Sequence, residues 1–131
     1  MIAMESRTLP APEPNPETKS YWDAAQEGKL LVRICTACGR AHHYPRALCP
    51  FCFSDRTEWK TASGNGTIYS FSVMQRAPVP YTIAYVTLDE GPTMMSNIVD
   101  CDFDTIRIGM KVKATFKPTE STARLPMFTP A

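Results

Sequence analysis

The chain has 131 residues, which suffices for one ordinary domain or for a small metal-binding module followed by one compact domain. Its 14 Lys and Arg residues nearly balance 13 Asp and Glu residues, and the net charge of +1 argues against a dedicated nucleic-acid-binding protein. No run of about 18 apolar residues is present, so we expect no membrane-spanning helix.

Residues 1–16 have the sequence of a flexible, proline-rich arm. Proline occupies every second position from Pro10 to Pro16, and because proline fixes φ and lacks a backbone N–H, it favours an extended chain. The arm is therefore either a flexible leader or a ligand for a partner protein. Met1–Arg7 lacks the apolar stretch of a signal peptide, so we expect a cytoplasmic protein with reduced cysteines.

A short helix is predicted next, over residues 17–27. The triplet Asn15–Glu17 supplies a capping side chain, a proline for the first helical position and an acid for the first turn. Gly28 is suited to end the helix. Tyr21 and Trp22 are large, adjacent aromatic residues on a short helix. They must dock either on the body of the domain or on a partner protein.

Four cysteines in two tight pairs are the most informative motif of the chain. Each Cys-x-x-Cys pair can form a knuckle that offers two thiolates, and two facing knuckles complete the tetrahedral site of a zinc ribbon. A zinc ion held by four thiolates has no open position, so the predicted zinc is structural; the spacing alone also allows iron. The ligands follow a strand predicted at Leu30–Ile34. They are Cys35, Cys38, Cys49 and Cys52.

The sequence offers no recognisable catalytic constellation. A returning strand is predicted at Arg40–Tyr44, and it contains His42 and His43. Because four thiolates already complete the metal site, we expect both histidines to be exposed strand residues or partner contacts. Cys101 stands alone and is expected to be a small core residue. We therefore assign no catalytic residue, and an enzyme acting through one of the two histidines remains an alternative.

Residues 61–131 are predicted to form a small antiparallel barrel, with residues 17–60 forming the helix and the ribbon. Five short strands joined by glycine and proline turns suit the OB-fold, although periodicity alone also allows an SH3-like barrel. The fold class is therefore mainly β, with an N-terminal helix. The predicted strands are Thr67–Val73, Ile83–Asp89, Thr93–Val99, a strand opening at Gly109, and Met127–Phe128.

Period-two alternation assigns faces to the first of these strands. The pattern predicts one aromatic face, because Thr67, Tyr69, Phe71 and Val73 alternate with Ile68, Ser70, Ser72 and Met74. Tyr69 and Phe71 would then suit base stacking, so a single-stranded nucleic-acid-binding module is the alternative function. The balanced charge argues against it, because phosphate contacts require a basic groove.

Several segments, taken in order, resemble one family. The chain is similar to the acyl-CoA-associated zinc-ribbon/OB-fold proteins first catalogued as domain of unknown function 35, over roughly residues 19–130. The segments that carry the resemblance are Tyr21-Trp22, Glu27–Leu31, Cys35–Arg40, Tyr44–Arg46, Cys49–Cys52, Gly66–Phe71, Leu88–Pro92 and Ile108–Val112.

The resemblance implies an N-terminal helix, a rubredoxin-like zinc ribbon and a C-terminal OB-fold. It implies a non-catalytic accessory subunit that binds a thiolase-like enzyme and helps hold or channel acyl-CoA. It does not indicate which acyl-CoA or which enzyme. Phe53 stands where the family commonly has glycine after the fourth cysteine, so we expect that turn to be built differently.

Site residues beyond the metal ligands follow from this implied function. Tyr21 and Trp22 are the expected anchors on the partner enzyme, provided that they are exposed. The stiff loop is expected to line the acyl-CoA channel, and two arginines are expected to contact its phosphates. The loop residues are Pro78, Pro80 and Tyr81, and the arginines are Arg40 and Arg46.

Overall fold

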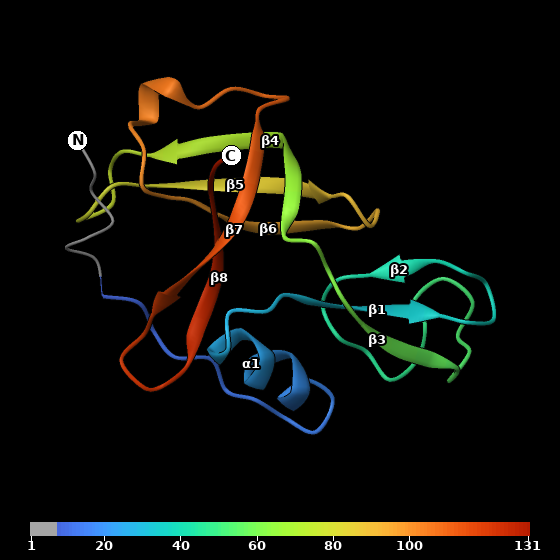
Figure 1. The fold of residues 1–131 in the computed structure, drawn as a ribbon. Coiled ribbons are helices and arrows are strands. Elements are labelled where there is room, and N and C mark those ends of the chain that lie inside the picture. Colours follow the sequence, from blue (N-terminus) through green and yellow to red (C-terminus); the bar gives the residue numbers. More distant parts are fainter. Residues whose placement is uncertain (1–7) are drawn as a thin grey trace.

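The computed structural model describes residues 8–131, so the first seven residues of the predicted arm lie outside the described part. A helix, a three-stranded sheet and a five-stranded barrel follow one another along the chain (Figure 1). No helix among the described residues is long and apolar enough to cross a membrane. The elements are α1 (Lys19–Gln26), β1 (Leu31–Cys35), β2 (Ala41–His42), β3 (Thr57–Thr61), β4 (Asn65–Met74), β5 (Tyr81–Leu88), β6 (Thr93–Ile98), the short 3₁₀ helix η2 (Phe103–Thr105), β7 (Lys111–Pro118) and β8 (Arg124–Pro130).

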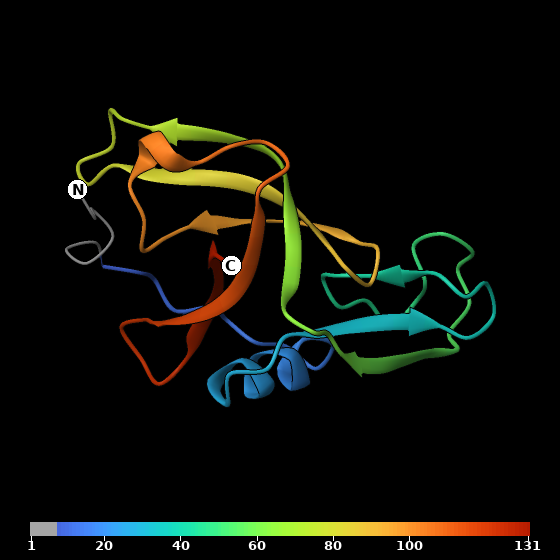
Figure 2. The same ribbon diagram turned by 45° about the horizontal axis from the view of Figure 1, so that its top comes forward.

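The first sheet carries the cysteine knuckles. Its strands have the order β2-β1-β3 and are antiparallel, with Arg33 of β1 opposite His42 on one side and Trp59 on the other. Figure 2 shows this sheet and helix α1 on the same side of the barrel, with β4 leading from the sheet into the barrel. The predicted returning strand at residues 40–44 is confirmed, although only two of its residues pair.

The second unit is a closed barrel with the strand order β4-β5-β6-β8-β7, which confirms the predicted five-stranded architecture. All neighbouring pairs are antiparallel except β6 and β8, which pair in parallel through Ile98 and Phe128 alone. Phe128 is fully buried in the main core, to which Tyr21 of the helix and Val32 of the ribbon also belong. Helix, ribbon and barrel therefore share one hydrophobic core.

Helix α1 ends before Gly28 as predicted, but it begins later than predicted, at Lys19, with Thr18 at its N-cap position and no side-chain capping hydrogen bond. The Asn15 side chain accepts hydrogen bonds from the backbone N–H groups of Glu17 and Thr18 at 3.0 and 3.1 Å, so it stabilises the turn that leads into the helix rather than the first helical turn. Gly28 follows the helix with a φ of +80°, a conformation that glycine adopts without steric cost.

The flexible-arm prediction does not hold for Leu9. Its side chain is buried against Val99 and Met127, and its carbonyl accepts a hydrogen bond from the Glu120 backbone N–H at 3.2 Å. Burial of the apolar Leu9 side chain stabilises the folded protein. The proline-rich composition of the arm did not indicate this contact.

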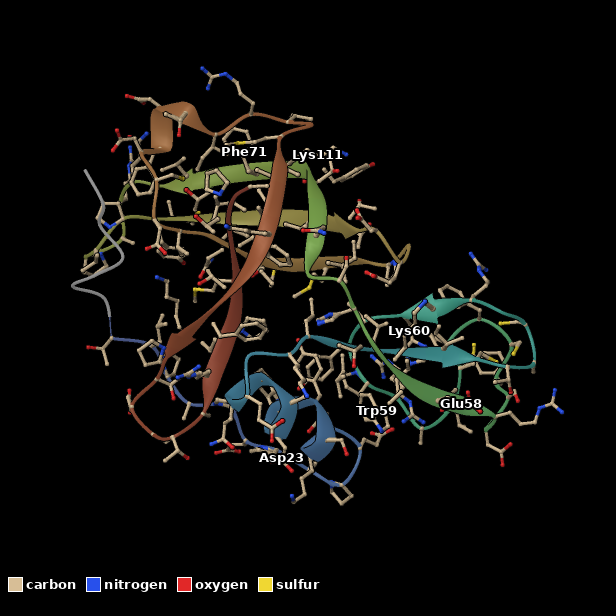
Figure 3. All side chains as sticks on the ribbon, viewed as in Figure 1. Asp23, Glu58, Trp59, Lys60, Phe71 and Lys111 are labelled. Atoms are coloured by element: carbon tan, nitrogen blue, oxygen red, sulfur yellow. The ribbon has the colours of Figure 1, made fainter. Side chains whose placement is uncertain are left out.

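The predicted aromatic face of the first barrel strand is wrong, because β4 contains a β-bulge. Ile68 pairs with Val86 and Ser70 pairs with Tyr85, so Tyr69 is an extra residue. A bulge shifts the alternation of side chains by one position. Tyr69 is 69% exposed, whereas Phe71 packs against the barrel core (Figure 3).

Gly66 is required where β4 passes close to β5. A Cβ atom on Gly66 would lie 2.7 Å from Cγ1 of Val86 and 2.9 Å from the carbonyl oxygen of Thr87. We expect Gly66→Ala to lower the free energy of unfolding by about 1–3 kcal/mol, because the two strands must move apart. Thermal unfolding measures this, with Ser72→Ala on the exposed side of β4 as the control; equal melting temperatures for the two variants would contradict the prediction.

Candidate metal centre and adjoining hollows

Four cysteines converge at the end of the ribbon sheet, as the spacing predicts. Their sulfur atoms all lie within 4.8 Å of one another, with 3.6 Å between Cys35 and Cys52 and 3.7 Å between Cys38 and Cys49. All four thiols are free. Four sulfurs around one zinc ion, each at about 2.3 Å, are separated by about 3.8 Å, so the donor set and its spacing fit a tetrahedral metal site.

The two knuckles have the same backbone geometry. Gly39 N–H donates to the Cys35 carbonyl and Phe53 N–H donates to the Cys49 carbonyl, both at 2.8 Å, and φ is +78° at Gly39 and +65° at Phe53. The expectation that Phe53 forces a different turn is therefore wrong. Its side chain is 75% exposed, so it meets no steric obstacle, and the residue accepts the left-handed conformation that usually favours glycine.

The knuckle backbone favours thiolate at the first ligand. A backbone N–H of Cys38 points at the Cys35 sulfur, and a second from Ala37 supports it. These hydrogen bonds lower the pKa of Cys35 to about 7, against the opposing effect of burial. A metal ion therefore meets a ligand that already loses its proton near neutrality.

The histidines do not occupy exposed strand positions, and neither belongs to the metal cluster. His42 is only 6% exposed. His43 is half-buried, and its Nε2 shares a 2.7 Å hydrogen bond with the Tyr21 hydroxyl. Burial lowers the pKa of His43 to about 4, with a further contribution from the neighbouring His42, and burial raises the pKa of Tyr21. Both partners of this hydrogen bond are therefore uncharged near neutral pH.

The expected anchor role of Tyr21 is contradicted. Tyr21 is 2% exposed and belongs to the main core. Trp22 is half-buried and packs edge-on against Tyr21, with ring centroids 4.9 Å apart. The two side chains differ in burial because adjacent residues of a helix point about 100° apart around its axis.

An apolar hollow of about 340 Å³ lies where helix α1, the end of β2 and the barrel strands β5, β6 and β8 meet. Its wall includes the Tyr21–His43 pair. The sequence does not reveal this hollow, because its residues come from five segments that only the folded barrel brings together. Its main apolar lining is Trp22, Tyr44, Tyr81, Met94, Met95 and Met127.

A second, more polar hollow of about 520 Å³ lies between the ribbon and the β5–β6 turn. The Arg40 guanidinium lies 4.0 Å from the centroid of the Phe51 ring in its wall, and Glu90 also lines this hollow. His43 lines both hollows.

The residues proposed for an acyl-CoA channel are therefore not all in one place. Tyr81 lines the apolar hollow and Arg40 the polar one. Pro78, Pro80 and Arg46 lie outside the walls of both, and Arg46 is exposed.

Known proteins share both parts of this architecture. Residues 22–58 match the family model "ChsH2, rubredoxin-like zinc ribbon domain", and residues 59–117 match "ChsH2, C-terminal OB-fold domain". A DUF35 domain-containing scaffold protein of Methanothermobacter thermautotrophicus is 38% identical over 109 residues, which span 77% of this chain and 82% of the relative. The chain belongs to the DUF35 family. The barrel is accordingly an OB-fold, and the knuckle sheet is a rubredoxin-like zinc ribbon.

Two further relatives of this DUF35 chain have names that describe a subunit or a complex. A "Probable enoyl-CoA hydratase alpha subunit" of Thermomonospora curvata is 33% identical over 93% of this chain, and the chain spans 40% of the length of that subunit. A chain of the solved structure described as "Ltp2-ChsH2(DUF35) aldolase" superposes with a TM-score of 0.81 and 32% identity. The superposition covers 92% of this chain and 98% of that one.

Proposed function

We propose that this DUF35 protein is a non-catalytic accessory subunit that binds a thiolase-like enzyme and helps hold its acyl-CoA substrate. The observation that carries the proposal is the match, over almost its whole length, to a chain of the Ltp2-ChsH2(DUF35) aldolase. The scaffold relative and the hydratase subunit support the same setting, because their names describe assembly and acyl-CoA processing.

The side chains of the described residues support a non-catalytic role. The metal site has four thiolate donors, so a zinc ion bound there has no position for water or substrate. Zinc, which we propose as the resident ion, would hold the ribbon together. His43 is tied to Tyr21, and His42 is buried with both ring nitrogens inaccessible to solvent. Neither histidine is placed to act as a general base on a bound substrate.

The nucleic-acid alternative loses its structural support. It required Tyr69 and Phe71 on one face, and the bulge in β4 separates them. We retain Trp22 as a partner contact and Arg40 as a phosphate contact of the proposed function. The other expected phosphate contact, Arg46, is exposed and available to a ligand that extends beyond the hollow.

The proposal is tested by isolating the native protein with its partners and by assaying the pure chain. We expect a thiolase-like enzyme to co-purify, and we expect the pure chain to show only background thiolase, hydratase and acyltransferase activity. Trp22→Ala should weaken the complex while leaving the chain folded. Turnover by the pure chain that His43→Ala abolishes would instead show an enzyme, and salt-sensitive binding of single-stranded nucleic acid without an enzyme partner would establish the alternative.

A further inference from the structure

One outer face of the barrel carries no charged side chain. Strands β4, β5 and β6 lie side by side (Figure 1) and contain no Asp, Glu, Lys, Arg or His, although charged residues make up 21% of the chain. Strand β7 alone, by contrast, has three lysines. We call the outward-facing side of these three strands the uncharged face. Its large side chains are Tyr69, Met74, Tyr81, Ile83, Tyr85 and Met95.

An exposed row of large side chains crosses the centre of the uncharged face. Tyr85 of β5 lies directly opposite Met95 of β6 and, on its other side, opposite Ser70, the neighbour of the bulge residue Tyr69. Tyr69, Tyr85 and Met95 are 69%, 48% and 62% exposed. A β-bulge re-aims a side chain, which explains the exposure of Tyr69. Tyrosine and methionine are enriched and charged residues depleted at protein–protein interfaces, so this composition is typical of an interface.

The apolar hollow adjoins the uncharged face. Ile83 and Met95 belong both to the face and to the wall of the hollow, together with the half-buried Trp22. The Trp22 Nε1 has no hydrogen-bond partner among the described residues. A buried donor without an acceptor costs free energy, so the wall favours an occupant that brings an acceptor as well as an apolar group. A protruding protein loop offers both, because each of its apolar side chains is accompanied by a backbone carbonyl.

The absence of charge determines which kind of partner the face fits. Nucleic acids and anionic membrane surfaces are bound through Lys and Arg side chains, and the three strands contain none. A charged protein surface would lose its hydration on docking without gaining an oppositely charged partner. The complementary surface is therefore an uncharged protein surface with an apolar protrusion.

We propose that the uncharged face and the adjoining hollow are the docking surface for the thiolase-like enzyme, which inserts an apolar side chain of its own uncharged surface into the hollow. This inference rests on the proposed function and adds to it the face that binds and the chemistry of the enzyme surface. It places the enzyme on the barrel strands and on Trp22 beside them, rather than on the arginines of the ribbon.

Charged substitutions on the face test the inference, with the enzyme that co-purifies with the native protein as the probe. Met95→Lys and Tyr69→Lys each place an ammonium group in the contact and should each weaken enzyme binding at least about tenfold. Ile108→Lys is the matched control, because Ile108 is 71% exposed but lies outside the three strands. All three variants should keep the wild-type melting temperature and zinc content, because the substituted side chains are open to solvent.

Salt dependence separates this face from the basic ribbon. Contacts between uncharged surfaces are only weakly affected by screening, so raising the ionic strength from about 0.1 M to about 0.3 M should change the affinity of the wild-type chain by less than about threefold. A complex held by Arg40 and Arg46 would instead weaken steeply over this range.

Three results would overturn the inference: wild-type affinity of both Met95→Lys and Tyr69→Lys for the enzyme, a steep loss of affinity with salt, or a dimer of the isolated chain that Met95→Lys dissociates. In the last case a second copy of the chain occupies the face. Each of these results leaves the proposed function intact as long as the enzyme co-purifies. A native protein isolated without any thiolase-like enzyme would overturn the proposed function itself, and this inference with it.

Discussion

Cys35→Ser should abolish stoichiometric zinc binding and unfold the ribbon. The serine removes one of four thiolates that lie within 4.8 Å of one another, and structural zinc sites of this kind contribute apparent binding free energies of about 10–16 kcal/mol. Unfolding of the ribbon should also destabilise the barrel. Val32 of β1 and Leu30, which precedes β1, belong to the same hydrophobic core as the barrel residues. Metal analysis and thermal unfolding, with and without a chelator, measure the effect.

Cys101→Ser is the matched control for that variant. Cys101 is a partly buried cysteine that packs against the core and lies outside the metal cluster. We expect it to retain one zinc per chain and to lose only a little stability. Full zinc content after Cys35→Ser, or iron in place of zinc in native protein purified without chelator, would refute the assignment.

Tyr21→Ala should destabilise the protein by about 3–5 kcal/mol, the usual cost of truncating a buried aromatic residue. Its ring lies in the common core of helix, ribbon and barrel. Its hydroxyl also shares a 2.7 Å hydrogen bond with His43 in the wall of the apolar hollow. Because the free energy of unfolding of a domain is only about 5–15 kcal/mol, this one substitution should remove a large part of it. Urea unfolding measures the loss.

Two variants divide this effect into its parts. Tyr21→Phe keeps the ring and should cost only about 0.5–1.5 kcal/mol for the lost hydrogen bond. Trp22→Ala, at the half-buried neighbouring position, should cost less than Tyr21→Ala. If Trp22→Ala unfolds the protein as strongly, Trp22 is a core residue as well and the partner surface lies elsewhere.

Structural features that depend on one short segment could be predicted from the sequence. The Cys-x-x-Cys pairs predict a metal site because the spacing itself forms the knuckles, and the sulfurs do converge. Gly28 predicts the end of the helix because C-capping acts over a few residues, whereas Asn15 caps the turn before the helix, which begins only at Lys19. The barrel strands were readable for the same reason, since alternation over five to eight residues marks a half-buried strand.

Other features depend on contacts between distant segments, and only the tertiary structure decides them. The bulge at Tyr69 is set by its pairing with β5, so alternation along β4 placed Phe71 on the wrong face. His43 looked exposed because nothing near it in sequence shows that Tyr21, 22 positions earlier, reaches its ring.

The sequence by itself predicted the four clustered cysteines and the order of helix, ribbon and barrel, because spacing and local pattern carry them. It also carried the resemblance to the family, through short segments spread along the chain. The apolar hollow was decided by the tertiary structure alone. Its lining comes from helix α1, the residues after β2 and strands β5, β6 and β8, and β6 and β8 pair at a single position. The hollow cannot be predicted from any single segment of the sequence. It depends on how the closed barrel and the packed helix share one hydrophobic core.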